Sequence, residues 1–383
     1  MEIIRDNSVE DIQMVDLKNQ YLNIKPLIDA AIQACVDTAA FIKGPQVAGF
    51  EAQLAKYLNA DHVVSCGNGT DALQIAMMAL GLKPGDEVIV PAFTYVATAE
   101  VIGLLGLIPV MIDVDPATFN INRRLVEAAI TPKTKLVVPV HLFGQCADME
   151  GILEVCKMHG IAVVEDAAQA IGASYTFTTG VVGKAGTLGD MGTTSFFPSK
   201  NLGCYGDGGA VYTQNDELAR KARMIANHGQ AKKYIHEMIG INSRLDSLQA
   251  AILSEKLPYL DAYTQARQKA AAHYDVSLAH ITSVEIPFRA AYSSHVFHQY
   301  TLKVPAQDRD RLQGYLRERK IPSMVYYPIP LNEQKAYQSL GRTVGDLAVT
   351  QELCKRVISL PIHTEMPEAH IAYISDTIAA YFA

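Results

Sequence analysis

The stretch HVVSCGNGTDALQIAMMALG, residues 62–81, begins with an apolar run, turns through two glycines and continues with apolar residues at helical spacing. Short apolar runs rich in valine are typical of strands that are buried on both faces. DALQIAMMALG has helical periodicity and ends at a glycine, which is a common C-terminal cap. The stretch therefore predicts a buried strand, a tight turn and a helix, the repeating unit of an α/β fold.

The same strand signal recurs up to about residue 215. Six further apolar runs carry it: EVIVP (87–91), IPVMI (108–112), KLVVPV (135–140), IAVVED (161–166), TTSFF (193–197) and GAVYT (209–213). Helical patterns such as DMEGILEVCKMHG (148–160) lie between them. We therefore expect a mostly parallel sheet with helices on both faces, and ligands at the carboxyl ends of its strands.

The last third of the chain has a different pattern. Residues 243–274 predict a long helical region, followed by a strand at 298–304, a helix at 308–320 and a strand at 323–327. These elements indicate a smaller α+β domain. We divide the chain into an N-terminal segment (1–25), a large α/β domain (26–255) and a small C-terminal domain (256–383).

The composition narrows the class of protein. Of the 383 residues, 49% are hydrophobic and 19% are charged, which is typical of a globular protein. The net charge of −7 and the lack of a strongly basic block argue against nucleic acid as a partner. The acidic start, MEIIRDNSVEDIQM, does not resemble a signal peptide, and the longest apolar run (101–112) is too short for a membrane span. We expect a cytoplasmic protein that does not bind a membrane.

The cysteines give no sign of a metal site or a disulfide framework. None of them forms a CxxC pair or clusters with histidine at zinc spacing, and no HExxH motif is present. The six are Cys35, Cys66, Cys146, Cys156, Cys204 and Cys354. We expect buried free thiols and no metal.

SCGNGTDAL (65–73) has the features of an anion site. Glycines let the backbone approach an anion, the N-terminal end of a helix attracts negative charge, Thr70 offers a hydroxyl and Asp71 can cap the helix. A plain strand-to-helix turn is equally compatible, because short glycine motifs are common. Gly67, Gly69 and Ala72 also have the GxGxxA spacing of dinucleotide sites. The next predicted strand, however, ends in VPAFTY without the carboxylate that binds ribose, and no GxxxxGK[ST] motif is present.

Asp166 ends the apolar strand in IAVVEDAAQAIGA (161–173), and Gln169 follows three residues later. A carboxylate at this position often caps the next helix. It can also keep a pyridine nitrogen protonated, which makes the ring an electron sink, and Gln169 could then donate to a ring oxygen. Glu165 points to the opposite face of the strand and is the weaker candidate.

Lys200 lies in SFFPSKNLGCYGDGGA (195–210), between an aromatic segment and a run of glycines. A lysine forms a Schiff base only through its neutral amine, which a desolvated setting favours. Ser195 offers a hydroxyl for a phosphate. A single loop lysine is usually solvated, but an anion cradle, a strand-end acid and a loop lysine follow one another here in one α/β domain.

Five blocks, in chain order, resemble one family: NGTDAL, PAFTYVATA, EDAAQAIGA, SFFPSKNLGCYGDGG and NSRLDSLQAAIL. They are similar to the signature blocks of the DegT/DnrJ/EryC1/StrS aminotransferases, and the similarity runs from residue 14 to residue 367. The resemblance implies the aspartate aminotransferase fold (fold type I), with a seven-stranded sheet in the large domain. It also implies pyridoxal 5'-phosphate (PLP) as cofactor and amination of nucleotide-linked keto-sugars. A dehydratase branch of the family has histidine where this chain has Lys200, so the lysine favours transamination.

The resemblance implies a role for each residue around the cofactor ring. Lys200 is the catalytic residue: it forms the Schiff base with PLP and returns as the base that moves the α-proton. Asp166 pairs with the pyridine nitrogen, Gln169 contacts the ring hydroxyl and Tyr95 stacks on the ring.

At the other end of the cofactor, the resemblance implies a phosphate site. Gly69, Thr70 and Ser195 hold the phosphate, and Asn242 reaches it from the neighbouring subunit. A homodimer with shared active sites is therefore expected.

The substrate is indicated by YYPIPLNEQKAY (326–337), which has Asn332 where many members have histidine. With ANHGQAKKY (226–234), it resembles the subfamily that uses L-glutamate to aminate UDP-2-acetamido-2-deoxy-3-oxo-D-glucuronate for O-antigen or related polysaccharides. Arg244 and Tyr327 are the matching substrate contacts, since a guanidinium binds both oxygens of a carboxylate. A helix-surface ion pair for Arg244, a packing role for Tyr327 and another UDP- or dTDP-keto-sugar stay open.

Three further points stay open. The segment 174–190 is slightly long for the family and could alter the mouth of the site or a surface contact. His228 and His298 lie in family-like segments, and we interpret both as structural. A nucleotide-binding oxidoreductase and a non-catalytic regulatory relative remain as other classes of function.

Overall fold

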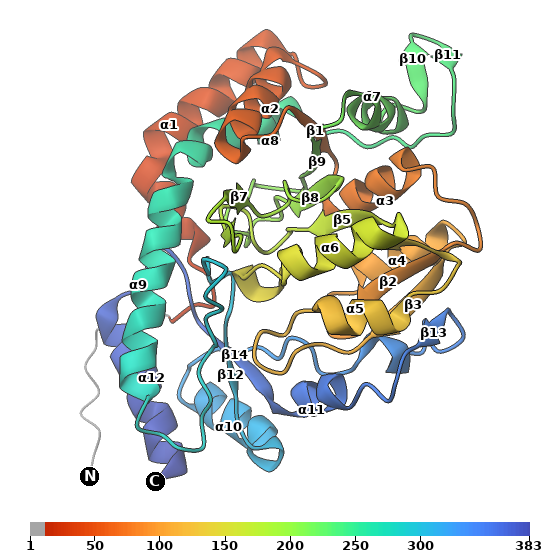
Figure 1. Cartoon of the computed structure of the whole chain (residues 1–383). Coiled ribbons are helices and arrows are strands. Elements are labelled where there is room, and N and C mark those ends of the chain that lie inside the picture. Colours follow the sequence, from red (N-terminus) through yellow and green to blue (C-terminus); the bar gives the residue numbers. More distant parts are fainter. Residues whose placement is uncertain (1–11) are drawn as a thin grey trace.

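The computed structural model describes residues 12–383, so the first part of the predicted N-terminal segment lies outside the described residues. A central sheet of eight strands dominates the fold (Figure 1). In spatial order the strands are β1 (His62–Cys66), β9 (Gly209–Thr213), β8 (Met191–Ser195), β5 (Ala162–Asp166), β4 (Thr134–Val137), β2 (Glu87–Pro91), β3 (Ile108–Ile112) and β13 (Arg342–Thr343). The seven predicted strands are all present. The eighth, β13, comes from the C-terminal part of the chain and pairs with β3.

The directions of the strands confirm the predicted fold class. Every neighbouring pair from β13 to β8 is parallel, whereas β9 is antiparallel to both of its neighbours. Because β9 reverses direction, β1 runs the same way as β8. The carboxyl ends of β1, β8, β5, β4 and β2 therefore lie along one edge of the sheet, where an open α/β sheet binds its ligands.

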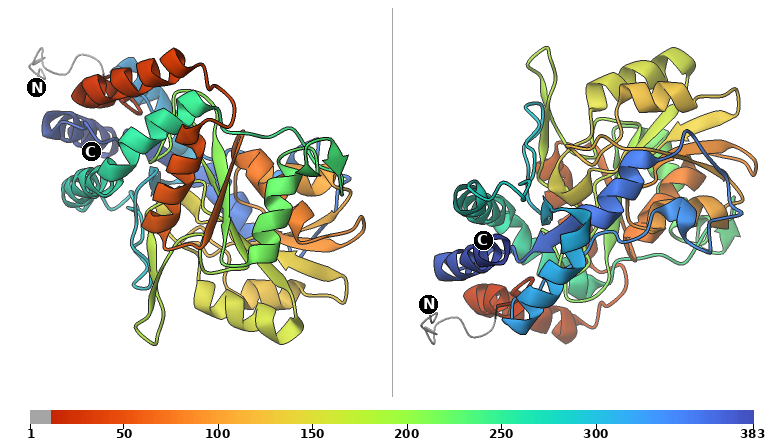
Figure 2. Two further views of the ribbon diagram at one scale, coloured as in Figure 1. Left: turned by 90° about the horizontal axis from the view of Figure 1, so that it is seen from above. Right: turned by 90° about the horizontal axis from the view of Figure 1, so that it is seen from below.

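Helices cover both faces of the sheet (Figures 1 and 2). On one face α5 (Arg123–Ala129) and α6 (Met149–His159) pack on side chains that include Ile89 and Val163. On the other face α3 (Gly69–Ala79), α4 (Ala97–Leu104) and α7 (Asp216–Ile225) pack on the adjacent Val88 and Val164. Since successive side chains of a strand point to opposite faces, one run of apolar residues supplies both cores.

A group of long helices connects the sheet to the C-terminal part. The predicted helical region 243–274 consists of α8 (Ser247–Lys256), the short η3 (Leu257–Tyr259) and α9 (Leu260–Leu278). Next to them lie α1 (Leu17–Thr38), which is kinked at Ile24 just before Pro26, and α2 (Pro45–Leu58). The kink follows from Pro26, which has no N–H for a helical hydrogen bond.

The C-terminal part has its own apolar core. Its antiparallel strands β12 (Tyr300–Lys303) and β14 (Val357–Leu360) pack with α10 (Ala306–Glu318) and α12 (Glu368–Phe382). The predicted strand at 323–327 is wrong, because Met324 forms only an isolated bridge with Ser359. The division at residues 25 and 255 stays a prediction.

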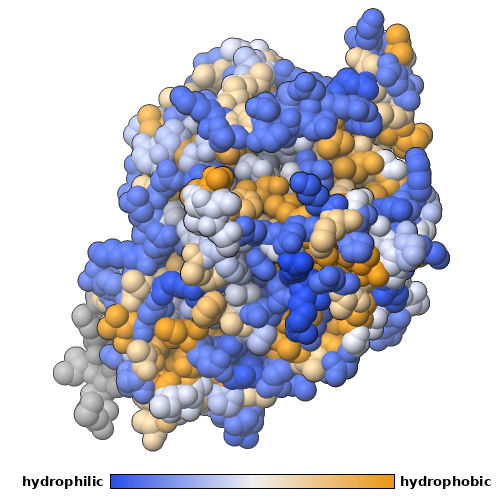
Figure 3. Space-filling view, in the orientation of Figure 1, coloured by the Kyte–Doolittle hydropathy of each residue, from blue (hydrophilic) through white to orange (hydrophobic). Residues whose placement is uncertain are grey.

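The remaining elements are short. They are the hairpins β6 (Ser174–Thr176) with β7 (Val182–Lys184) and β10 (Gln230–Lys232) with β11 (Ile235–His236), together with η2 (Leu142–Gly144), η4 (Leu331–Glu333) and α11 (Ala348–Arg356). The β10–β11 hairpin projects from the body of the molecule (Figures 1 and 3). Within residues 12–383, no helix combines the length and the apolar character that a bilayer crossing needs.

Candidate active site

A cavity of about 650 Å³ opens at the carboxyl edge of the sheet. It is formed where β1, β2, β4, β5 and β8 end, with further side chains from the segments before β12 and around residue 326. The predicted site residues that line it are Gly69, Thr70, Tyr95, Asp166, Gln169, Ser195, Lys200 and Tyr327. Asn242 and Arg244, which were also predicted for the site, do not line it.

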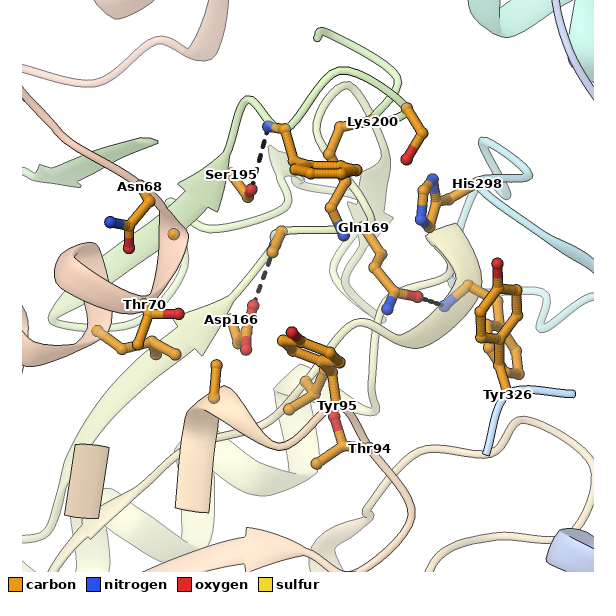
Figure 4. Close-up of a pocket in the computed structure, with 18 of the residues that line it drawn as sticks. Asn68, Thr70, Thr94, Tyr95, Asp166, Gln169, Ser195, Lys200, His298 and Tyr326 are labelled. Atoms are coloured by element: carbon orange, nitrogen blue, oxygen red, sulfur yellow. Dashed lines mark hydrogen bonds between the residues drawn. The ribbon is translucent and has the colours of Figure 1, made fainter. Parts of the chain in front are cut away.

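Lys200 extends into this cavity from the turn after β8 (Figure 4). The backbone of the turn is fixed, since the Lys200 N–H donates to the Phe197 carbonyl at 2.8 Å and Cys204 N–H donates to that of Phe196 at 2.8 Å. Burial lowers the pKa of Lys200 to about 8, and the carboxylate of Asp166 acts in the opposite direction. At pH 7 about one amine in ten is then neutral, against about three in ten thousand at the ordinary pKa. The turn thus holds a lysine that can act as a nucleophile.

Asp166 is buried at the end of β5, with its carboxylate toward the cavity. One oxygen accepts from the Ala168 N–H and the other from the Thr98 hydroxyl, both at 3.1 Å. Burial raises its pKa, whereas the Ala168 N–H, the Lys200 ammonium and the Thr98 hydroxyl act in the opposite direction. A carboxylate in this setting is stabilised further by a cationic N–H group in the cavity.

Gln169 and Tyr327 are joined by a hydrogen bond across the cavity wall. The Gln169 side-chain oxygen accepts from the Phe143 N–H at 2.8 Å, which fixes the orientation of the amide. Its Nε2 donates to the Tyr327 hydroxyl at 3.1 Å. The second amide proton of Gln169 and the hydroxyl proton of Tyr327 stay available for a ligand.

The end of the cavity at α3 has the form of an anion cradle. Asn68 caps α3 by accepting from the Asp71 N–H at 2.8 Å, so the suggestion that Asp71 is the cap is wrong. Thr70 and Ser195 line the same end (Figure 4). A Cβ on Gly69 would lie 2.7 Å from the Cβ of Ser195, so only glycine allows α3 to approach β8 this closely. The start of α3 and the side chains of Thr70 and Ser195 thus lie at the same end of the cavity, where a helix N-terminus favours an anion.

These residues fit the chemical groups of PLP. The cradle suits its phosphate, buried Asp166 suits a protonated pyridine nitrogen, and Lys200 suits the aldehyde. Tyr95 lines the cavity with 58% of its surface exposed, which leaves an aromatic face for a flat ring. Its centroid lies 6.3 Å from that of Tyr327. The donor set therefore matches the cofactor that the sequence predicts.

Arg244 lies on the far side of the β1–α3 turn, in a neighbouring pocket of about 250 Å³. Lys43 and Arg223 line the same pocket. The alternative of a helix-surface ion pair is wrong, because Arg244 precedes α8 and has no salt bridge within residues 12–383. Asn242 is exposed and lines neither pocket.

Ser243 is a residue that the sequence reasoning missed. Its hydroxyl accepts from the Gly67 N–H at 2.9 Å and donates to the Asp71 carboxylate at 2.6 Å. It therefore fixes the segment 242–244 to the back of the anion cradle. The one signal in the sequence is its position between Asn242 and Arg244, two predicted site residues of the NSRL block.

The carboxylate neighbour of Asp166 has a different role. Glu165 points away from the cavity, as predicted, and accepts from the backbone N–H groups of Gly186, Leu188 and Gly189 at 2.6–2.9 Å. His141 Nε2 lies 2.8 Å from it. Glu165 thus holds the C-terminal end of the segment 174–190 against β5. No residue of that segment lines the cavity.

Comparison with known proteins decides the family. The model of the DegT/DnrJ/EryC1/StrS aminotransferase family matches residues 23–379. The chain belongs to this family. Among its relatives it is 49% identical, over 95% of this chain and 98% of the other, to UDP-2-acetamido-2-deoxy-3-oxo-D-glucuronate aminotransferase of Pseudomonas aeruginosa. It is 48% identical, over 97% of this chain and 99% of the other, to the pleiotropic regulatory protein of Geobacillus stearothermophilus.

A solved structure agrees with this assignment. The crystal structure of NtdA from Bacillus subtilis with bound cofactor PMP superposes with a TM-score of 0.86 at 31% identity. The match covers 98% of this chain and 86% of that chain. Together with the parallel sheet and the cavity at its carboxyl edge, this family assignment confirms the predicted aminotransferase fold.

Proposed function

We propose that the protein is a PLP-dependent aminotransferase that transfers the amino group of L-glutamate to a nucleotide-linked keto-sugar. The observation that carries the proposal is the pairing of Lys200, an amine with a pKa of about 8, with buried Asp166 in one cavity. In a PLP site the carboxylate would keep the pyridine nitrogen protonated, and the lysine amine would meet the aldehyde at the opposite end of the ring. A nucleotide-binding oxidoreductase would need neither.

The residues of the chain divide the work at the cofactor ring. PLP, when bound, withdraws electrons from the substrate carbon that loses its proton. Asp166 would accept a hydrogen bond from the pyridinium N–H, Gln169 would donate its free amide proton to the ring hydroxyl, and Tyr95 would cover one face of the ring. Lys200 Nζ takes the proton from the substrate carbon and returns it, since its pKa near 8 suits both directions.

The phosphate is assigned to the cradle of Gly69, Thr70 and Ser195. The Ser195 hydroxyl already accepts from the Phe197 N–H at 3.2 Å, so its own proton is free to be donated. The free N–H groups at the start of α3 add further donors. Orientation of the phosphate would in turn fix the ring relative to Lys200.

The cavity of one chain has too little positive charge for this substrate class. Among residues 12–383, Lys200 is the one lysine or arginine that lines it, whereas Asp71, Asp166 and Asp207 contribute carboxylates. A nucleoside diphosphate, a sugar carboxylate and the cofactor phosphate are all anionic. We therefore assign Asn242 and Arg244 to the active site of a second copy, where Asn242 reaches the phosphate and Arg244 the sugar carboxylate.

Exposed apolar side chains support this homodimer. Tyr234 and Ile239, in and beside the projecting β10–β11 hairpin, are 78% and 84% exposed. Figure 3 shows apolar and polar side chains mixed on this projection. Side chains of this kind are buried readily between two copies of a chain.

The sugar is assigned by similarity. The Pseudomonas aeruginosa relative is named for UDP-2-acetamido-2-deoxy-3-oxo-D-glucuronate, and we propose the same substrate, with Tyr327 as a further contact. The product, a 3-amino sugar nucleotide, would serve the synthesis of O-antigen or a related surface polysaccharide in the cytoplasm. Other UDP- or dTDP-keto-sugars are the alternative.

The test is a glutamate-dependent assay with a panel of UDP- and dTDP-keto-sugars that includes the 3-oxo-uronate. We expect a yellow protein whose visible band L-glutamate bleaches, and borohydride should attach the cofactor to Lys200 irreversibly. Amination should be fastest with the 3-oxo-uronate. A protein that takes up no PLP, or that binds PLP but does not react with glutamate, would contradict the proposal and favour a regulatory role.

A further inference from the structure

His298 is buried in the wall of the active-site cavity without a hydrogen-bond partner. The residue is 6% exposed, and Figure 4 shows its ring on the cavity side, near Lys200 and Tyr326. Nδ1 is fully buried and makes no hydrogen bond within residues 12–383. Nε2, the nitrogen that is open to the cavity, makes none either. Buried polar groups without a partner are rare and require an explanation.

A neighbouring histidine shows what a structural role looks like in the same segment. His295 is 8% exposed, its Nδ1 accepts from the Phe297 N–H at 3.1 Å, and its ring stacks on Phe297 at 3.9 Å. The third buried histidine near the cavity, His141, has partners on both ring nitrogens. Among the three, His298 alone has a ring that the rest of the described chain leaves unbound.

The backbone around His298 is held firmly, which fixes the point from which its side chain enters the cavity wall. The Val296 N–H donates to the Gly144 carbonyl at 2.8 Å, and the Val296 carbonyl accepts from the side chain of Asn201, the residue after Lys200, at 2.9 Å. Arg267 donates to the Phe297 carbonyl at 3.1 Å. A Cβ on Gly144 would lie 3.0 Å from the backbone nitrogen of His298, which shows how closely the two segments pack.

The surroundings of His298 keep the imidazole neutral. Burial, followed by the charges of Lys200 and Arg267, holds its pKa well below the ordinary value. A neutral imidazole carries one N–H donor and one bare nitrogen. With the proton on Nε2, the donor faces the cavity and the bare Nδ1 is the atom that stays buried.

The cradle and His298 lie at different ends of the cavity. Asn68, Thr70 and Ser195 form one end, and His298 lies with Tyr326 at the other, beyond Lys200 (Figure 4). If the phosphate of PLP lies in the cradle and the reacting carbon of the substrate lies at Lys200, the other atoms attached to that carbon would lie beside His298. His298 would then contact the substrate and not the cofactor.

We infer that His298 is a substrate-binding residue whose Nε2–H donates to an oxygen close to the reacting carbon of the amino donor or of the sugar. The inference rests on the proposed function and adds one residue to it. A carboxylate oxygen of glutamate and a hydroxyl or carbonyl oxygen of the sugar have the same acceptor chemistry. The two half-reactions distinguish them, because each presents one substrate alone.

The test compares His298→Phe, His298→Gln and His298→Asn with the wild-type holoenzyme. Phenylalanine keeps a ring of similar size without a donor. Glutamine places an amide N–H near the position of Nε2, and asparagine places one near Nδ1. Bleaching of the visible band is measured in single turnovers with L-glutamate in one arm and with the 3-amino UDP-sugar in the other. The dissociation constant of PLP and the Tm of each variant are measured as well.

In at least one arm we expect His298→Phe to lower the rate constant at subsaturating substrate by about tenfold to a hundredfold. His298→Gln should recover most of this loss and His298→Asn little of it, with the affinity for PLP unchanged. The arm that responds identifies the substrate. His295→Phe, the matched control, should lower the Tm without changing either half-reaction per bound PLP.

Unchanged rates in both arms for His298→Phe would overturn the inference. Equal recovery by glutamine and asparagine would do the same, and this comparison holds even if the phenylalanine variant does not fold. A wild-type protein that is bleached by neither substrate would instead contradict the proposed function. The two failures are therefore distinguishable.

Discussion

The carboxyl edge of the sheet and the segment 242–244 both carry residues that the sequence marks for one site, but only the first brings them into one cavity. Gly69, Asp166 and Lys200 come from separate strand ends and face the same space. Asn242 and Arg244 lie two residues apart and do not line that space. The sheet topology of one chain brings the first set together, whereas the second set would reach a substrate only in the proposed dimer. One chain therefore brings together the residues proposed for the cofactor ring, whereas Asn242 and Arg244 would act in the site of a second copy.

The largest effect is expected at Lys200. Lys200→Ala removes both the proposed nucleophile and the proposed base, and we expect kcat to fall by about a thousandfold or more. The fold and much of the PLP affinity should persist, since the cradle and Asp166 are unchanged. Steady-state turnover with L-glutamate, together with PLP titration by fluorescence, measures the two quantities.

A second buried lysine provides the control. Burial also lowers the pKa of Lys256 to about 8, but its amine donates to the Gly203 carbonyl at 2.6 Å and does not line the cavity. Lys256→Met should lower the Tm and leave kcat within about threefold. Equal loss of turnover in the two variants would mean that burial of a lysine, and not its place at the strand edge, decides the activity.

Arg244 tests the other half of the comparison. Arg244→Ala should lower kcat/KM for the keto-sugar by about tenfold to a hundredfold and leave the glutamate half-reaction much less affected. Arg123→Ala, which removes a surface pair with Glu154, is the control and should have no effect.

Mixing the two variants shows where Arg244 acts. If each active site takes Lys200 from one chain and Arg244 from the other, mixed dimers of Lys200→Ala with Arg244→Ala contain one intact site. An equal mixture that is allowed to exchange subunits should recover about a quarter of the wild-type activity. Activity that stays at the level of the separate variants would place Arg244 in the site of its own chain.

Much of the site was predictable because strand ends are readable in the sequence. An apolar run followed by Asp166, and a glycine turn followed by a helix, each fix a position at the sheet edge. The side-chain contacts were not readable in this way. Asn68 caps α3 in place of Asp71, and Ser243 joins two distant segments, because such hydrogen bonds depend on distances across the fold. The extra strand β13 is only two residues long and has no apolar run to announce it.

The role of His298 was also not readable in the sequence. A lone histidine in a sequence is more often structural, and His295, three residues earlier, behaves that way. Only the three-dimensional arrangement shows that one ring is bonded and the other is open to the cavity. Histidine spacing alone does not carry that information.

Glu165 and Asp166 are neighbours at the end of β5, and we expect Glu165 to act on stability and not on activity. In Glu165→Gln the new amide group must face either the Gly186 N–H or the N–H groups of Leu188 and Gly189, so donor meets donor. We expect the free energy of unfolding to fall by about 2–4 kcal/mol in chemical denaturation. PLP affinity and kcat should change little, since Glu165 points away from the cavity.

The matched control for Glu165 contacts the same loop from the surface. Glu150 accepts from the backbone N–H and the hydroxyl of Thr178 at 2.9 and 2.6 Å. Glu150→Gln should lower the free energy of unfolding much less than Glu165→Gln, because water can replace those bonds. A loss of PLP affinity in Glu165→Gln, with stability unchanged, would contradict the assignment of opposite roles to the two faces.

The smallest effect expected is the pH dependence of the apoprotein. Well below pH 8 Lys200 is protonated in both the folded and the unfolded chain, so the cost of its buried charge is fully present and constant. Between about pH 8 and the ordinary pKa near 10.5, the folded chain loses this proton first and the unfolded chain binds more protons. The free energy of unfolding should therefore rise with pH in this window.

Because Lys200 is partly accessible from the cavity, we expect this rise to be about 1–3 kcal/mol. Urea denaturation of the apoprotein at several pH values measures it, with Lys200→Met as the reference. Lys256 contributes in the same direction in both proteins, so the difference between them isolates Lys200. Parallel pH profiles would mean that the Lys200 amine keeps an ordinary pKa in the folded chain. The reactivity assigned to it would then have to arise only after the cofactor is bound.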